Sequence, residues 1–239
     1  FRENTVGFRM HDCLKFDREM LPSYTRHSLP VLGNELLWGV GFVATSVIIG
    51  RIGSVFVAAN SIAGVLNQLV FISVSGVANA AAVLTGKTIG EGSRGRVQKV
   101  ANTLLLFSVL VGVFNCLLVL VIRPLFLLLY NVTPETYEAA YTIIGVLACL
   151  QLVLGIDVTC IVGILRGGGD ARFVFFNDVF YLWVFCIPVG WWCSQQAGIP
   201  VFMTFFILRC DDVIKAFVGD WRIHHGQWIH QVTVQERTS

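Results

Sequence analysis

Two carboxylates, Glu35 and Asp157, lie deep inside otherwise uncharged apolar stretches that are long enough to span a membrane. An ionisable side chain at the centre of a membrane helix costs about 2.5 to 3.5 kcal/mol even on lenient insertion scales. Membrane proteins keep such groups mainly to bind ions or charged solutes. We therefore expect Glu35 and Asp157 to bind an ion or a charged solute.

The composition predicts the membrane setting that this interpretation needs. The chain is 55% hydrophobic and 13% charged, whereas an ordinary soluble domain is about 25% charged. Several stretches reach the length of about 20 residues that a helix needs to cross a bilayer. The expected spans are residues 28–49, 54–85, 100–122, 139–165, 173–194 and 199–219. The fold class is therefore an all-α integral membrane protein with six transmembrane helices.

The sixth span differs from the other five because its apolar part ends at Leu208 and charged residues follow. Continued as a helix, the segment would pair Asp211 with Lys215 at i, i+4. The distribution of basic residues supports this sixth helix, because 15 of the 17 lysines and arginines fall in the two tails and in two loops on one side, and only Arg51 and Arg123 fall on the other. The positive-inside rule places the basic side in the cytoplasm. We expect residues 1–27 to form a cytoplasmic connector or interfacial segment and residues 222–239 a cytoplasmic tail.

Other segments that resemble chemical motifs have simpler structural explanations. Gly86-Lys87-Thr88 looks like the end of a phosphate loop, but Ala81 stands where the first glycine of that motif should be. The seven cysteines have no CxxC spacing, so no disulfide framework or cysteine metal site is expected. Asp170 is expected to cap the helix that follows it. We expect no enzymatic activity, no bound cofactor and no nucleic-acid partner.

Several short motifs occur in a defined order along the chain. They are Pro30-Val31-Leu32-Gly33-Asn34-Glu35-Leu36-Leu37-Trp38, Gly50-Arg51-Ile52-Gly53, Ala58-Ala59-Asn60-Ser61-Ile62, Gly86-Lys87-Thr88-Ile89-Gly90-Glu91-Gly92 and Leu165-Arg166-Gly167-Gly168-Gly169-Asp170, followed by a span with Asp178, Trp183, Ile187 and Pro188. Together they resemble the carboxy-terminal half, helices seven to twelve, of a bacterial MATE (multidrug and toxic compound extrusion) transporter. The resemblance runs from about Ser23 to Trp228.

The resemblance implies a two-lobe transporter of which this chain supplies one lobe. Two six-helix lobes would enclose a cavity that opens alternately to each side of the membrane, as in other transporters built from repeats. The amino-terminal six-helix lobe of the same polypeptide would be missing here. Because the chain begins at Phe1 without a methionine, we expect it to be a fragment of a longer protein.

The resemblance also bears on the two acids. Members of the family have an acidic residue in helix seven and, in one sodium-coupled branch, an aspartate in helix ten, and Glu35 and Asp157 fall where these are expected. At 1.5 Å of rise per residue, the two acids lie about 10 and about 13 Å from the cytoplasmic ends of their helices. They could therefore share one cation, with Na⁺ as the candidate metal ion and the two carboxylates as its ligands. The tyrosine that this branch often has one turn before the aspartate is Val153 here, which leaves coupling by Na⁺ and by H⁺ both open.

A second group of residues could line the same cavity. Asn34 and Trp38 flank Glu35, and Asp178 lies near the cytoplasmic end of its span. The remaining candidates are the side-chain amides of the second span, Asn60, Asn67, Gln68 and Asn79. Hydrogen bonds between neighbouring helices would explain these amides as well as substrate contacts would.

The function expected from these observations is secondary active multidrug efflux in a bacterial inner membrane. Cationic or amphipathic organic compounds would be exported in exchange for Na⁺ or H⁺, with the lipid bilayer and the substrate as partners. One alternative is a flippase for lipid-linked oligosaccharides, which should show a cationic groove instead of buried acids. A second alternative is a membrane fragment that does not transport.

Overall fold

The computed structural model describes residues 21–92, 94–196, 201–225 and 228–229. Every regular element within these residues is helical. The α-helices are α1 (Leu21–Ile52), α2 (Ser54–Gly90), α3 (Arg94–Leu127), α4 (Pro134–Val158), α5 (Ala171–Val179), α6 (Ile187–Gln195), α7 (Val201–Ile207) and α8 (Cys210–His225). Two π-helical segments, η2 (Thr159–Leu165) and η3 (Phe180–Cys186), extend α4 and connect α5 with α6.

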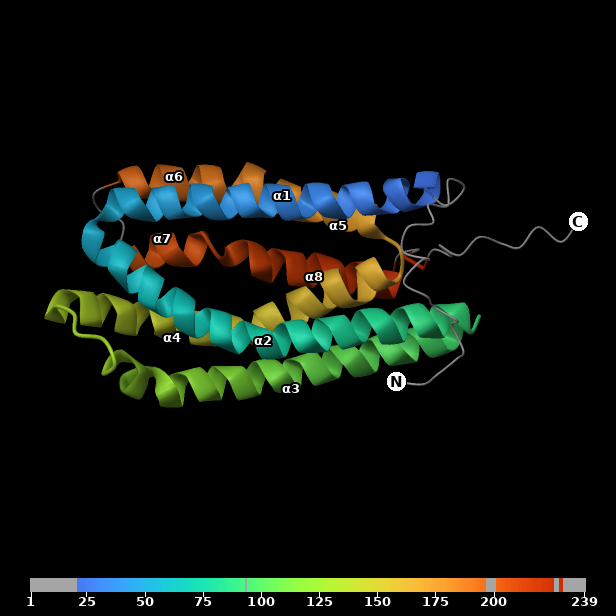
Figure 1. Cartoon of the computed structure of the whole chain (residues 1–239), viewed down its shortest axis with the longest axis horizontal. Coiled ribbons are helices and arrows are strands. Elements are labelled where there is room, and N and C mark those ends of the chain that lie inside the picture. The colour runs from blue at the N-terminus through green and yellow to red at the C-terminus, as the bar shows by residue number, and fades with distance from the viewer. Residues whose placement is uncertain (1–20, 93, 197–200, 226–227, 230–239) are drawn as a thin grey trace, which may run out of the picture.

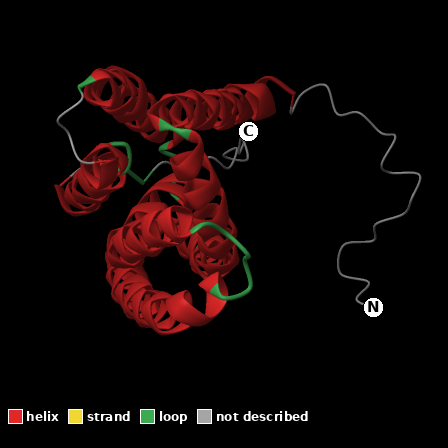
Figure 2. Ribbon diagram, turned by 90° about the vertical axis from the view of Figure 1, so that its left-hand side faces the viewer, coloured by secondary structure: helices red, strands yellow, loops and turns green. Residues whose placement is uncertain are grey.

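The helices form two layers with a third element between them. In Figure 1, α1, α5 and α6 lie along one side of the bundle, while α2, α3 and α4 pack together along the other. Between these layers lie α7 and α8, and α8 packs against α4, η2 and η3. Figure 2 looks along the bundle and shows most helices nearly end-on. Residues on α8 are therefore placed to contact both layers.

Five helical stretches are long and apolar enough to cross a membrane. They are Ser28–Ile52, Ser54–Gly90, Gly95–Leu127, Pro134–Leu165 and Ala171–Gln195. Large apolar side chains such as Leu36, Ile72 and Leu128 are mostly exposed on the outside of the bundle, as expected for surfaces that contact lipid instead of water. The expected all-helical membrane fold is confirmed.

The sixth expected span is interrupted instead of continuous. Helix α7 ends at Ile207, a turn follows at residues 208–209, and α8 begins at Cys210. In this turn the backbone N–H of Leu208 donates to the carbonyl of Thr204 at 3.0 Å, and that of Arg209 to the carbonyl of Phe206 at 3.0 Å. The interruption coincides with the change from apolar to charged sequence. It leaves the first turn of α8 between the two layers.

The two ends of the bundle carry different amounts of positive charge. The α1–α2 and α3–α4 connections lie at one end, whereas the α2–α3 connection, the start of α5 and the end of α8 lie at the other (Figure 1). Lys87, Arg172 and Arg222 belong to the second end, and Arg51 and Arg123 to the first. The segregation of charge expected from the sequence is thus present in the fold.

Small residues allow α4 and η2 to approach their neighbours closely. A Cβ atom on Gly155 would lie 3.0 Å from the backbone oxygen of Ser108 in α3. A Cβ atom on Gly163 would lie 2.8 Å from the Cβ of Ala81 and 3.0 Å from the backbone oxygen of Ala78, both in α2. Close backbone approach through glycine and alanine is the usual way in which membrane helices gain packing contacts. These contacts fix the position of the helix that carries Asp157.

The helix cap expected for the Asp170 side chain is absent. Its side chain makes no capping hydrogen bond to the helix that follows. Instead it accepts hydrogen bonds from the guanidinium of Arg222, with Oδ2 at 3.1 Å from Nε and 3.0 Å from Nη2. Asp170 therefore joins the start of α5 to the end of α8.

Of the expected terminal segments 1–27 and 222–239, α1 begins within the first, at Leu21, and α8 extends into the second, to His225. Trp228 is buried, and residues 1–20, 226–227 and 230–239 lie outside the described ranges.

Candidate functional site

Three helices change their geometry next to an acidic residue. Asp157 lies in the last turn of α4, directly before η2, and Asp178 lies at the end of α5, directly before η3. Asp211 and Asp212 occupy the first turn of α8, directly after the turn that separates it from α7. π-Helical segments within helices occur frequently at functional sites, and interrupted helices form the binding sites of many transporters. The four acids therefore occupy positions typical of a site in a membrane protein.

Lys215 connects three of these acids. Its Nζ atom lies 3.0 Å from Oδ2 of Asp211, 3.6 Å from Oδ1 of Asp212 and 3.9 Å from Oδ1 of Asp178. The side chain of Lys215 is almost completely buried, at 5% exposure, and those of the three acids are at most 12% exposed. A buried charge needs a partner of opposite charge because its hydration is lost. The ammonium of Lys215 serves as that partner for Asp178, Asp211 and Asp212. Together with Asp157, on which the charge of Lys215 also acts, we call these acids the acidic cluster (Asp157, Asp178, Asp211 and Asp212).

Asp157 is the least satisfied member of the acidic cluster. The residue is 5% exposed, and its Oδ1 atom has no hydrogen-bond partner among the described residues. The charges that act on it belong to Lys215, Asp212, Asp178 and Asp211. A buried polar atom without a partner costs about 1 to 3 kcal/mol. The Oδ1 atom of Asp157 is thus a buried hydrogen-bond acceptor without a partner among the described residues, and several charged side chains act on it.

Asn34 connects α1 to the acidic cluster. Its Nδ2 group donates a hydrogen bond to Oδ2 of Asp178 at 2.9 Å, across 144 residues of sequence. Asn34 itself is buried, and its Oδ1 atom has no partner among the described residues. The amide therefore holds Asp178 in place and presents a second unused acceptor.

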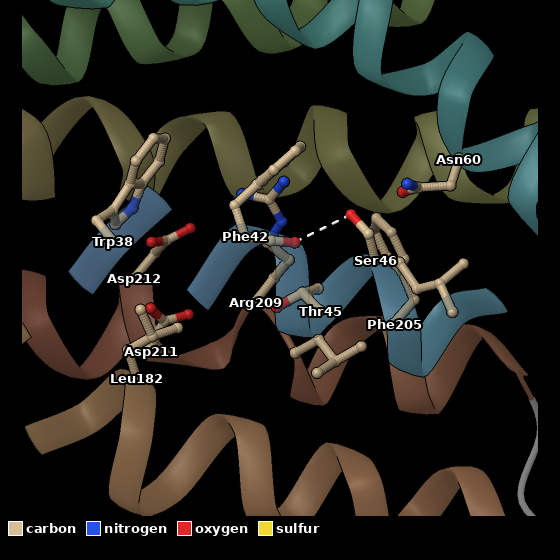
Figure 3. Close-up of a pocket in the computed structure, with 12 residues that line it drawn as sticks. Trp38, Phe42, Thr45, Ser46, Asn60, Leu182, Phe205, Arg209, Asp211 and Asp212 are labelled. Carbon is tan, nitrogen blue, oxygen red and sulfur yellow. Dashed lines mark hydrogen bonds between the residues drawn. The ribbon is translucent and has the colours of Figure 1, made fainter. Parts of the chain in front are cut away.

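A pocket of about 60 Å³ lies between α1 and the α7–α8 segment. Figure 3 shows Trp38 and Phe42 of α1 beside Asp211 and Asp212 of α8. The other lining residues are Thr45, Ser46, Ile49, Asn60, Leu182, Phe205, Leu208 and Arg209. Aromatic side chains next to carboxylates suit an organic cation, because both the ring faces and the acids attract positive charge. The pocket also reaches two members of the acidic cluster from outside.

Glu35 lies apart from Asp157 and has a different partner. Its Oε1 atom accepts a hydrogen bond from Nη1 of Arg166 at 2.8 Å. The Glu35 side chain is 56% exposed, whereas that of Arg166 is 17% exposed. This ion pair links α1 to the residue that follows η2. Of the residues predicted from the sequence, the structure thus brings together Asp157, Asp178 and Asn34. It places Glu35 in a separate ion pair with Arg166.

The amides of the second span are divided between two roles. Asn60 lines the pocket. Asn67 accepts a hydrogen bond from Nε2 of Gln151 in α4 at 2.7 Å, which is a contact between helices. Gln68 and Asn79 are exposed on the surface of α2. Asn60 is therefore the amide of this span that adjoins the candidate site.

The sequence interpretation did not single out Asp211, Asp212 and Lys215 as site residues. It treated Asp211 and Lys215 as an i, i+4 pair that extends the sixth helix. The signal was available, because the basic-residue count required a sixth span and these charged residues fall inside it. The same rule that selected Asp157 would have selected them.

Three members of the acidic cluster are arranged around a lysine. Among the described residues, no group of three or more histidine, cysteine, aspartate or glutamate side chains is placed to hold a metal. The acids surround Lys215 instead of an open centre. The arrangement is that of a buried ion-pair network next to a pocket.

A helical membrane lobe with charged residues at interrupted helices is the architecture of a secondary transporter built from repeated lobes. The sequence profile of the MatE family matches residues 30–192. The chain belongs to this family of MATE proteins.

Relatives and solved structures agree with this assignment. The chain is 29% identical over 150 residues to the multidrug resistance protein MdtK of Yersinia pseudotuberculosis serotype O:1b (strain IP 31758). The matched residues make up 63% of this chain and 33% of MdtK. Among solved structures, it matches an outward-facing multidrug resistance MATE family transporter of the MOP superfamily with a TM-score of 0.78 at 15% identity, over 91% of this chain and 49% of that one. It also matches a MOP superfamily transporter from Pyrococcus furiosus, described as having a binding pocket of reverse polarity, with a TM-score of 0.69 at 18% identity, over 85% of this chain and 44% of that one. The chain therefore spans about a third of this relative and about half of these structures, which corresponds to a single lobe.

Proposed function

We propose that this chain is the carboxy-terminal lobe of a secondary active multidrug transporter. The transporter exports cationic or amphipathic organic compounds in exchange for Na⁺ or H⁺ by alternating access. The observation that carries this proposal is the buried Asp157 carboxyl, whose Oδ1 atom has no partner among the described residues, within an acidic cluster that adjoins the pocket. A transporter needs such a site because the coupling ion and the substrate must compete for the same negative charge.

The coupling mechanism follows from this competition. A cation that enters from the outside and binds the acidic cluster neutralises it, and a bound organic cation then loses part of its stabilisation and leaves. An elementary charge that moves across the membrane potential supplies about 2.3 kcal/mol per 100 mV. An inward gradient of Na⁺ or H⁺ can therefore drive outward movement of the organic compound. Glu35 would join the process through Arg166, because the two residues form an ion pair between α1 and the residue that follows η2.

The other wall of the substrate site would come from an amino-terminal lobe of the same polypeptide. The pocket of about 60 Å³ is much smaller than the sites of about 300 to 1,000 Å³ that hold drug-sized ligands. A second lobe facing α1 and α7–α8 would enlarge this pocket into a cavity. The basic end of the bundle, which includes Lys87, Arg172 and Arg222, would face the cytoplasm of a bacterial inner membrane.

The experiment that tests this function is efflux of a fluorescent organic cation. Cells or vesicles that contain the full-length protein are given an imposed Na⁺ or H⁺ gradient, and the wild type is compared with Glu35→Gln and Asp157→Asn. The matched control is Asp220→Asn, which removes an acid from α8 that is 49% exposed and lies outside the acidic cluster. We expect the two site variants to lose efflux and the control to keep it. Efflux that is undiminished in both site variants would contradict the mechanism.

The same pocket weighs against a flippase for lipid-linked oligosaccharides. A diphosphate would require a cationic groove, whereas Asp211 and Asp212 line this pocket and Arg209 is the one basic residue among its lining residues. A membrane fragment that does not transport would show no response to either Glu35→Gln or Asp157→Asn. The efflux assay therefore also distinguishes this alternative.

A further inference from the structure

We propose that the ammonium of Lys215 occupies the place that a free monovalent cation would otherwise take in the acidic cluster, and that Lys215 thereby excludes Na⁺ from it. This inference rests on the proposed function, because it specifies which coupling ion the cluster can accept. It makes Lys215 a specificity-determining residue.

The geometry around Lys215 matches an ammonium better than a metal ion. An ammonium has three N–H donors, and three carboxylates surround this one at 3.0, 3.6 and 3.9 Å from Nζ. A hard metal cation draws its oxygen ligands in to about 2.3 to 2.6 Å. No set of three acidic, histidine or cysteine side chains in the described part of the chain is close enough together for that. Asp211 lies within hydrogen-bond distance of the ammonium, and Asp212 and Asp178 lie within ion-pair distance, so all three carboxylates are centred on Lys215.

The charge balance shows that the cluster has room for positive charge if the ammonium is removed. Three buried carboxyls, those of Asp157, Asp211 and Asp212, and the carboxyl of Asp178, whose side chain is 12% exposed, lie around one buried ammonium. The guanidinium groups of Arg209 and Arg166 add positive charge near Asp212 and Asp178 respectively. Asp157 is a second, independent sign of a site, because the residue is only 5% exposed and its Oδ1 atom has no hydrogen-bond partner among the residues that the structure describes. Without Lys215, this oxygen and its neighbours would lack a central cation.

The position of Lys215 at the start of α8 depends on the surrounding carboxylates. A helical side chain leans toward the N-terminus of its helix, so the ammonium of Lys215 lies at the level of Asp211 and Asp212 in the first turn of α8. The N-terminal end of a helix disfavours positive charge. The carboxylates must therefore offset an unfavourable helix dipole. A lysine has a long flexible stem, which allows the ammonium to reach back to these carboxylates.

The test is Na⁺ binding to the purified full-length protein, measured with radioactive sodium and as Na⁺-dependent thermal stabilisation. The variant is Lys215→Met, which keeps an unbranched stem and removes the charge. The controls are Lys215→Arg, which keeps the charge, and Lys87→Met, which makes the same change at an exposed lysine. We expect Lys215→Met to bind one additional Na⁺ per polypeptide, at a half-saturating concentration at least about tenfold below any binding at this cluster in the wild type. Lys215→Arg and Lys87→Met should behave as the wild type does.

Equal Na⁺ stoichiometry and affinity in the wild type and in Lys215→Met would overturn the inference. Chemical rescue keeps it testable if Lys215→Met does not fold. Lys215→Ala should be stabilised saturably by butylammonium but not by butanol, whereas the wild type should show no comparable shift with the amine. An absence of rescue would also count against the inference. Because both measurements detect binding and not transport, their outcome is independent of the efflux assay, and a failure of the proposed function would appear only in efflux.

Discussion

Removal of the Lys215 charge should destabilise this lobe more than any other single charge deletion among its described residues. At an effective dielectric constant of about 20, a pair of charges 3 to 4 Å apart is worth about 4 to 6 kcal/mol before desolvation is counted. Lys215 makes three such pairs, at 3.0, 3.6 and 3.9 Å, and its side chain is 5% exposed. Because part of this energy offsets the loss of hydration, the net cost of deleting one partner of a buried pair is about 3 to 5 kcal/mol.

We therefore expect Lys215→Met to lower the free energy of unfolding by about 3 to 5 kcal/mol when no Na⁺ is present. The assay is thermal unfolding of the purified protein in an N-methylglucamine buffer, and the expected decrease in Tm is on the order of 10 °C. Lys87→Met is the matched control and should leave Tm nearly unchanged, because Lys87 is exposed.

A double-mutant cycle with Asp211→Asn separates the pair from general damage. The Nζ of Lys215 and the Oδ2 of Asp211 are 3.0 Å apart, and residues in one ion-pair network are coupled by about 0.5 to 3 kcal/mol. Lys215→Met should therefore cost less in the Asp211→Asn background than in the wild type. The reasoning is refuted if Lys215→Met is as stable as Lys87→Met, or if the two substitutions in α8 have additive effects.

Three further outcomes follow from contacts elsewhere in the lobe. Gly163→Val should lower the free energy of unfolding by about 1 to 3 kcal/mol, because its Cβ would lie 2.8 Å from another Cβ in α2; chemical denaturation against Gly163→Ala measures this, and equal stability of both variants with the wild type would contradict the close packing. Asp170→Asn should lower the Tm more than Asp220→Asn does, because Asp170 binds Arg222 between α5 and α8; equal Tm values for the two variants would show that this ion pair does not hold the helices together. Oxidation should cross-link Cys186 to Cys210, whose sulfur atoms lie 3.9 Å apart; mass spectrometry of the digested protein detects the linked peptides, and a link to a different cysteine would be inconsistent with the packing of η3 against α8.

The sequence by itself determined the class of protein and most of its helices. Apolar stretches of span length can only be helical when no water is available to the backbone, because each unsatisfied peptide group in lipid costs several kcal/mol. The basic residues predicted which connections between spans lie on the same side of the membrane, since these residues are distributed along the chain in blocks that alternate with the spans. Asp157 could be identified as a buried acid because an isolated charge within an apolar stretch is visible in a one-dimensional pattern.

Only the tertiary structure decided which charges meet. Asn34 and Asp178 are 144 residues apart and form a hydrogen bond, and no periodicity in the sequence relates them. The break between α7 and α8 and the two π-helical segments also depend on packing, because the same local sequence is compatible with a continuous helix. The sequence predicted similar depths for Glu35 and Asp157, but the direction of a side chain around its helix depends on neighbouring helices. That direction places Glu35 beside Arg166, and it places Asp157 in the field of Lys215.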